Sequence, residues 1–188
     1  KGMQNKRPVI FWLISVVIVV LLVSLIVVAP VAAATGHTEV SAGIYHAFSP
    51  FCHQRADRSY FIAGYQFAVC SRCTGVYAGF ALTLLLYPFI RSLKSTVMPP
   101  RIMLVLAALP LAIDFSVTFF GFWENTHTSR LLTGALLGSV TVFYVMPGIV
   151  ELSLRNSRTT LAKPMFTLAS PEAIASAPSD YSAPDRRI

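Results

Sequence analysis

The sequence predicts an all-α integral membrane protein with four transmembrane helices. Four apolar segments, at residues 9–34, 70–90, 102–122 and 131–150, are each long enough to cross a bilayer, which takes about 20 residues of α-helix. Only 12% of the 188 residues are charged, whereas a soluble domain has about 25%. Lipid offers the backbone no hydrogen-bond partner, so each segment is expected to be a helix.

The first segment has features of a cleavable signal sequence. Lys6 and Arg7 precede it, and it ends in small residues at positions 32–34. Its apolar core is nevertheless longer than the roughly 7–15 residues of a signal peptide. We therefore expect residues 1–34 to form an N-terminal arm and a retained first membrane helix.

Residues 35–69 are predicted to form a loop that carries cysteine and histidine, with short helices near residues 41–48 and 56–63. Residues 70–152 then form a three-helix membrane core. The last segment, 153–188, is rich in Ala, Ser and Pro, a composition typical of linkers. We expect it to be a cytoplasmic tail that lies against another subunit.

The distribution of Lys and Arg predicts the orientation in the membrane. Eleven of the 15 basic residues lie on the side of the two termini, and the other four are Arg55, Arg58, Arg72 and Arg130. The positive-inside rule therefore places both termini in the cytoplasm and the 35–69 loop outside the inner membrane. The net charge of +7 follows from this rule. No basic stripe alternates with aromatic residues, so nucleic-acid binding is not expected.

All three cysteines and all four histidines fall on the predicted extracytoplasmic side. Cys70 and Cys73 form a Cys-x-x-Cys pair at a helix start, and zinc sites commonly take two ligands from such a pair. Cys52 and His53 from the preceding loop, or His127 from the next outer loop, would complete a set of three cysteines and one histidine. The sequence therefore favours a site for zinc or another transition metal.

Two alternatives use the same cysteines. The outer side of a bacterial membrane is oxidising, so Cys52 could form a structural disulfide with Cys70 or Cys73. A redox-active pair of Cys70 and Cys73 is the second alternative, because a helix N-terminus and Arg72 lower a thiol pKa. The sequence lacks Cys-x-x-Cys-His for covalent haem, and one chain has too few cysteines for an iron–sulfur cluster.

Asp114 lies about 12 Å inside the third predicted helix, at about 1.5 Å per residue. A charge at that depth usually faces a partner or a water-filled cavity. Arg72 and Arg130 begin neighbouring helices and could reach it, which favours a buried ion pair that fixes helix packing. A proton or ion site is the alternative.

Further charged residues on this side are expected to form a solvated rim, or else to bind an anionic headgroup or a quinone-like ring: Arg55, Asp57, Arg58, Glu124 and Arg130.

Two helices begin with similar small-residue patterns. Gly75 and Gly79 open the second helix, and Gly134 and Gly138 open the fourth. Glycines four residues apart allow two membrane helices to approach closely. We expect close packing of these helices near the outer leaflet; an internal duplication is a weaker interpretation.

Five short motifs stand out together: Cys52-His-Gln54, Arg58-Ser-Tyr60, the run from Cys70 to Gly79, Ile113-Asp114 and the run from Arg130 to Gly134. In these motifs the chain resembles a bacterial and archaeal membrane-protein family known as domain of unknown function 2085. The chain departs from the family pattern at Phe115, where Gly is usual, and at His127, where Asn is usual. The resemblance implies a multi-helix membrane protein and supplies no activity.

We therefore expect an accessory or structural subunit of a larger membrane complex, in electron transfer or photosynthesis, with a zinc-like site that stabilises the outer loop. Its expected partners are the lipid bilayer and other proteins. The alternative function is a membrane-embedded thiol-redox or metal-dependent enzyme that uses Cys70, Cys73 and Asp114.

Overall fold

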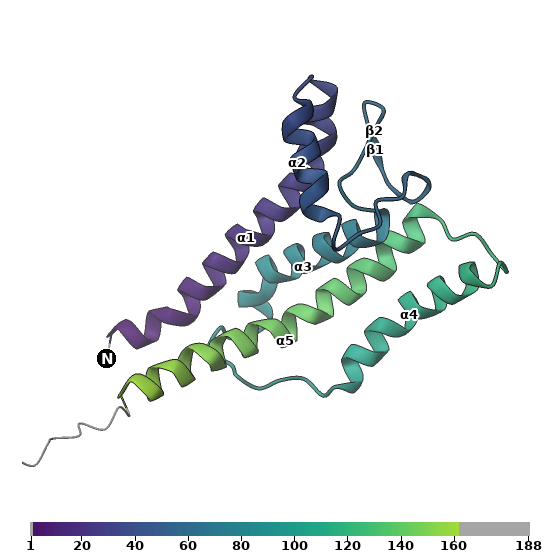
Figure 1. The fold of residues 1–188 in the computed structure, drawn as a ribbon. Coiled ribbons are helices and arrows are strands. Elements are labelled where there is room, and N and C mark those ends of the chain that lie inside the picture. The colour runs from purple at the N-terminus through teal and green to yellow at the C-terminus, as the bar shows by residue number, and fades with distance from the viewer. Residues whose placement is uncertain (1, 162–188) are drawn as a thin grey trace, which may run out of the picture. The chain divides into compact units, whose positions relative to one another are not determined.

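The computed structural model describes the backbone of residues 2–161 and the side chains of residues 7–152. Within these residues, four helices are long and apolar enough to cross a membrane (Figure 1), which confirms the predicted fold class. The predicted tail at 153–188 falls largely outside the described residues. The elements are α1 (Gly2–Ala34), α2 (Thr38–Phe48), the 3-10 helix η1 (Ala56–Arg58), β1 (Phe61–Ile62), β2 (Tyr65–Gln66), α3 (Ser71–Ile90), α4 (Ile102–Phe119) and α5 (His127–Leu161).

Capping residues set the ends of α4 and α5. Helix α4 ends at Phe119, three residues before the predicted end, because Gly121 adopts a φ of 74°. The backbone N–H groups of Gly121 and Phe122 then donate to Thr118 and Val117, the pattern that terminates many helices. Helix α5 begins four residues earlier than predicted because Thr126 caps it: its Oγ1 accepts from the Ser129 N–H at 3.1 Å.

The loop between α1 and α3 contains one full helix and a short β-ribbon. Helix α2 covers the residues predicted at 41–48. The helix predicted at 56–63 is wrong beyond Arg58, where an antiparallel ribbon pairs Ile62 with Tyr65. Ala63 and Gly64 both have positive φ, as a two-residue turn between twisted strands requires. The aromatic and β-branched residues around this turn favour strands over helix.

Helices α1, α3 and α5 share an apolar core. The indole N–H of Trp12 in α1 donates to the Leu84 carbonyl of α3 at 2.8 Å. Leu84 in turn packs with Val142 and Met146 of α5. A second cluster joins Ile26 near the end of α1 to residues of the loop and the start of α3. Below, "the cysteine end" means the end of the bundle where α1 finishes at Ala34 and where α3 and α5 begin.

Helices α3 and α5 run parallel from the cysteine end with their backbones in direct contact (Figure 1). A Cβ atom added to Gly75 or Gly79 would lie 2.1 or 2.2 Å from the carbonyl oxygen of Leu131 or Ala135. The contact is reciprocal. A Cβ added to Gly134 or Gly138 would lie 2.2 or 2.1 Å from the carbonyl oxygen of Arg72 or Val76. Only a residue without a side chain allows this approach.

Helix α4 is attached differently. Ala107 is the buried residue of this helix, and most of its large apolar side chains are exposed. Its polar attachments lie near its two ends. Tyr144 of α5 donates to the Pro100 carbonyl at 2.8 Å just before α4 begins, and Asp114 binds residues of α3 and α5 close to where α4 finishes.

Candidate functional site

Three cysteines converge at the cysteine end. The Sγ atoms of Cys52, Cys70 and Cys73 all lie within 4.8 Å of one another. Cys52 is only 5% exposed, whereas Cys70 and Cys73 are half-buried. Cys70 is the residue that precedes α3, and its backbone N–H donates to the Cys52 sulfur at 3.2 Å. Two segments separated by 18 residues thus meet at their thiols.

The loop holds Cys52 in place through apolar packing and through one glutamine. Cys52 lies in the apolar cluster with Ile26 and Val69, and a turn after α2 directs its N–H to the Phe48 carbonyl at 3.1 Å. The Gln54 amide donates to the carbonyls of Tyr45 and Ala68, at 2.7 and 2.9 Å. Gln54 therefore joins the end of α2 to the segment that leads into α3.

The close approach of the three thiols favours one thiolate within the cluster. Hydrogen bonds from the thiols of Cys52 and then Cys73 hold the pKa of Cys70 well below its ordinary value. A thiolate is the form that binds metals and acts as a nucleophile. The cluster can therefore bind a metal ion or carry out thiol chemistry.

The two histidines proposed as ligands lie outside this cluster. His53 is exposed and lines the cavity beside the cysteines. The His127 ring lies 5.5 Å from the ring of Tyr60, whose hydroxyl donates to the His127 carbonyl at 3.3 Å. Within the described part of the chain, three cysteines alone bring potential ligand atoms this close together.

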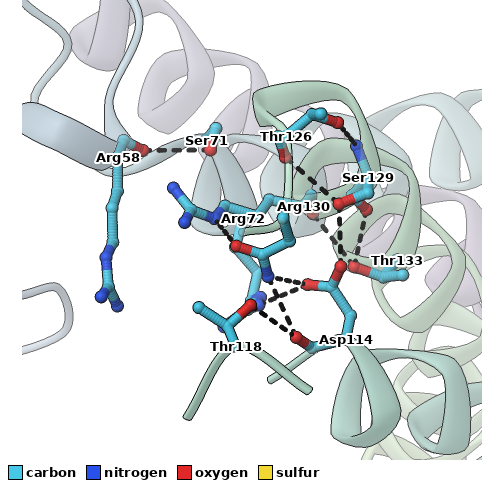
Figure 2. Close-up of polar contacts among 10 residues, drawn as sticks. Arg58, Ser71, Arg72, Asp114, Thr118, Thr126, Ser129, Arg130 and Thr133 are labelled. Carbon is cyan, nitrogen blue, oxygen red and sulfur yellow. Dashed lines mark hydrogen bonds and ion pairs between the residues drawn. The ribbon is translucent and has the colours of Figure 1, made fainter. Parts of the chain in front are cut away.

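Asp114 is the centre of a polar network between α3, α4 and α5 (Figure 2). Arg72 forms an ion pair with its Oδ2 at 2.6 Å, and their side chains are 20% and 11% exposed. Asn125 also donates to Oδ2 at 2.6 Å, and Ser129 donates to Oδ1 at 2.8 Å. Both carboxylate oxygens thus have partners. This network connects α4 to the other two helices.

Arg130 does not bind Asp114 directly. Its Nε donates to the Asn125 side-chain oxygen at 2.6 Å, so Asn125 connects Arg130 to Asp114. The Arg130 residue is 9% exposed. Among the described residues, no carboxylate lies within salt-bridge distance of it. The Nε of Arg72 is also buried and has no hydrogen-bond partner there.

A cavity of about 440 Å³ joins these two groups of residues. All three cysteines contribute to its wall. Four arginines line it as well: Arg55, Arg58, Arg72 and Arg130. A smaller space of about 70 Å³ lies beside Arg58, Arg72 and Arg130. The cavity is therefore both thiol-bearing and strongly basic.

The remaining predicted charges lie at the surface. Arg55 and Arg58 pair with Asp57 at 3.1 and 3.4 Å, and hydrogen bonding to Arg55 lowers the pKa of Asp57. More than half of the Asp57 side chain is exposed, so this pair contributes little to stability. Glu124 is exposed too.

The sequence did not point to two residues of the network. Neither Asn125 nor Ser129 stands out in the sequence. Their signal is faint, because a short polar loop before a helix usually contains capping residues. The one sequence feature that indicates nearby polar partners is Asp114, a carboxylate inside the preceding helix.

Comparison with known proteins identifies the family. The family model described as "Predicted membrane protein (DUF2085)" matches residues 52–144, which include the cysteines, Asp114 and the glycines of both helices. An uncharacterized protein of Methanocaldococcus jannaschii is 36% identical over 113 residues, covering 60% of this chain and 72% of the relative. An uncharacterized protein of Methanothermobacter thermautotrophicus is 36% identical over 91 residues, covering 48% of this chain and 80% of the relative. No solved structure matches the chain significantly. The chain is a member of the DUF2085 family of multi-pass membrane proteins.

Proposed function

We propose that this protein is an accessory subunit of a membrane complex, in which Cys52, Cys70 and Cys73 bind a zinc-like metal ion. The observation that carries the metal proposal is the convergence of three thiols from two separate segments within 4.8 Å. The bound ion would connect the end of the α2 segment to the first turn of α3. Its role is to fix the loop between α1 and α3.

The spacing of the sulfur atoms supports a metal over a disulfide. Tetrahedral zinc with Zn–S bonds of about 2.3 Å places its sulfur ligands roughly 3.8 Å apart. Sulfur atoms within 4.8 Å of one another need only a small movement to reach that geometry. A disulfide requires sulfur atoms about 2.05 Å apart and would use only two of the three thiols.

The fourth ligand would come from the cavity. His53 lines it and is a candidate, since a zinc site of three cysteines and one histidine is a common structural type. A ligand that is not part of the chain could occupy the same position. With His53 as the fourth ligand, the site is closed and structural. With an outside ligand in that position, the metal keeps one coordination position open for chemistry.

Metal analysis of the purified protein tests this proposal. We expect about one zinc-like ion per chain, measured by mass spectrometry of the metal content, and its loss in Cys52→Ser and in Cys73→Ser. His127→Ala is the matched control, because its ring lies against Tyr60 instead of the cysteines. A wild-type protein without metal, in which alkylation detects a disulfide, would overturn the proposal.

The alternative is thiol-redox catalysis by Cys70 and Cys73. The lowered pKa of Cys70 and its position beside a cavity favour this second function. It predicts a reversible disulfide with a measurable reduction potential and reduction of a small disulfide substrate. A metal-loaded protein that is inert in that assay excludes this alternative.

The subunit role, the partner complex and the membrane location belong to the same proposal. The excess of Lys and Arg on the side of the termini supports an inner-membrane protein with the cysteine end outside the cytoplasm. A role in electron transfer or photosynthesis would require defined protein partners. Co-purification after mild solubilisation should recover them in fixed stoichiometry, whereas a chain that runs alone contradicts the subunit role.

A further inference from the structure

We propose that Arg58, Arg72 and Arg130 form a binding site for an oxyanion of the phosphate type. The three side chains line both the cavity of about 440 Å³ and the adjoining space of about 70 Å³. They come from the loop, from the start of α3 and from the start of α5. None of them is a proposed metal ligand, although the three cysteines line the same cavity.

The burial of Arg130 is the first observation behind the site. A guanidinium group carries five N–H donors and one full charge. Arg130 is 9% exposed, and the hydrogen bond of its side chain goes from Nε to the neutral amide of Asn125. A buried charge is costly unless an opposite charge or several hydrogen bonds compensate it. Arg130 lines both spaces, so its remaining donors can bind an acceptor there.

Arg72 and Arg58 increase the need for an anion. Both lie close enough to Arg130 for their positive charges to act on it. Arg72 uses one terminal nitrogen on Asp114, while its buried Nε has no partner among the described residues. Among the described residues, the Arg58 guanidinium forms an ion pair only with the exposed Asp57. Four arginines thus line the cavity, and no carboxylate among the described residues lines it with them.

An oxyanion with several oxygens matches this arrangement. The planar fork of arginine binds phosphate and carboxylate oxygens in pairs, and three arginines suit a group with three or four oxygens. The arginines belong to the starts of α3 and α5 and to the loop beside them. That position fits a lipid phosphate, because basic pockets between membrane helices bind headgroups. A free phosphate ion would present the same oxygens.

Binding experiments on the intact chain test the site and distinguish the two sources. In one arm, inorganic phosphate is titrated calorimetrically into protein in a neutral detergent, with chloride holding the ionic strength constant. In the other arm, protein in phosphatidylcholine nanodiscs is compared with protein in nanodiscs that contain phosphatidylglycerol, and bound lipid is counted by native mass spectrometry. Saturable binding of phosphate indicates a soluble ligand, and retention of phosphatidylglycerol alone indicates a headgroup.

Variants connect binding to the arginines. We expect Arg58→Gln to weaken binding about tenfold or more, and Arg130→Gln to weaken it further, since each removes charge-assisted hydrogen bonds. Arg101→Gln is the matched control, because this exposed arginine lies at the other end of α4. If Arg130→Gln does not fold, Arg58→Gln decides, because Arg58 lies in the loop outside the helix contacts. The proposal is overturned if wild type binds neither probe, or if Arg58→Gln and Arg101→Gln bind equally.

Discussion

The α3–α5 contact and the attachment of α4 show two ways to join membrane helices. Between α3 and α5, four glycines bring the two backbones together, with carbonyl oxygens where side chains would normally be. Helix α4 exposes most of its apolar surface and is attached through Asp114, a residue that is costly in a membrane. One contact depends on shape, and the other depends on charge and hydrogen bonding.

The difference follows from the solvent. In a bilayer, lipid chains are as apolar as leucine, so burying apolar side chains supplies little drive for association. Close packing of glycine surfaces gains van der Waals contact, and a polar residue gains partners that lipid cannot offer. The two contacts should therefore respond to different kinds of substitution.

The largest effect is expected from an added methyl group in the glycine contact. In Gly138→Ala the new Cβ would lie 2.1 Å from the Val76 carbonyl oxygen. The backbone cannot rotate away as a side chain can, so the helices must separate. We expect a loss of about 3 kcal/mol or more in the free energy of unfolding, at the upper end for overpacked cores. Titration with SDS in mixed micelles measures it.

Gly148→Ala is the control on the same helix. A Cβ there meets only the flexible end of Met98, at 3.8 Å. Its stability should be unchanged or slightly higher, because alanine is the better helix former. Equal destabilisation by both substitutions would show that close approach at Gly138 is not what joins α3 to α5.

The second effect tests the polar attachment. Asp114→Ala leaves Arg72 without its ion-pair partner and removes acceptors from Asn125 and Ser129. We expect a loss of about 2 kcal/mol, less than for a fully buried pair because both side chains are partly exposed. The same titration measures it. Asp57→Ala, which breaks an exposed pair, should leave stability unchanged, and a comparable loss there would argue against a special role for Asp114.

The smallest effect comes from one hydrogen bond of the network. Ser129→Ala removes the donor to Asp114 Oδ1, which is 2.8 Å away, and should cost about 1 kcal/mol. Thr141→Ala is the control on the same helix, because it removes only a local hydrogen bond to the Leu137 carbonyl. In the Asp114→Ala background, Ser129→Ala should have almost no further effect, and full additivity of the two losses would mean that Ser129 acts elsewhere.

Much of the architecture could be predicted from residue order alone. The length and apolarity of four segments predict the helices because the thickness of a bilayer sets the length of a span. The spacing of Gly75 and Gly79 indicated a packing face, and the depth of Asp114 indicated a need for partners. The ribbon after Arg58 was missed because the turn at Ala63 and Gly64 is a short-range signal within a loop rich in aromatic residues.

The sequence by itself determined which residues were unusual: three thiols at one end, a carboxylate inside a span and four glycines in two helices. Only the tertiary structure decided which of them meet. In the structure, His127 packs against Tyr60, apart from the cysteines, and Arg72 instead of Arg130 forms the ion pair with Asp114. Asn125 lies between Arg130 and Asp114. The physical reason is that distances across a bundle depend on how far two helices approach and at which residue each begins. The glycine contact sets how closely α3 and α5 approach, and the caps set where α4 ends and α5 begins. The periodicity of residues within one helix gives neither of these.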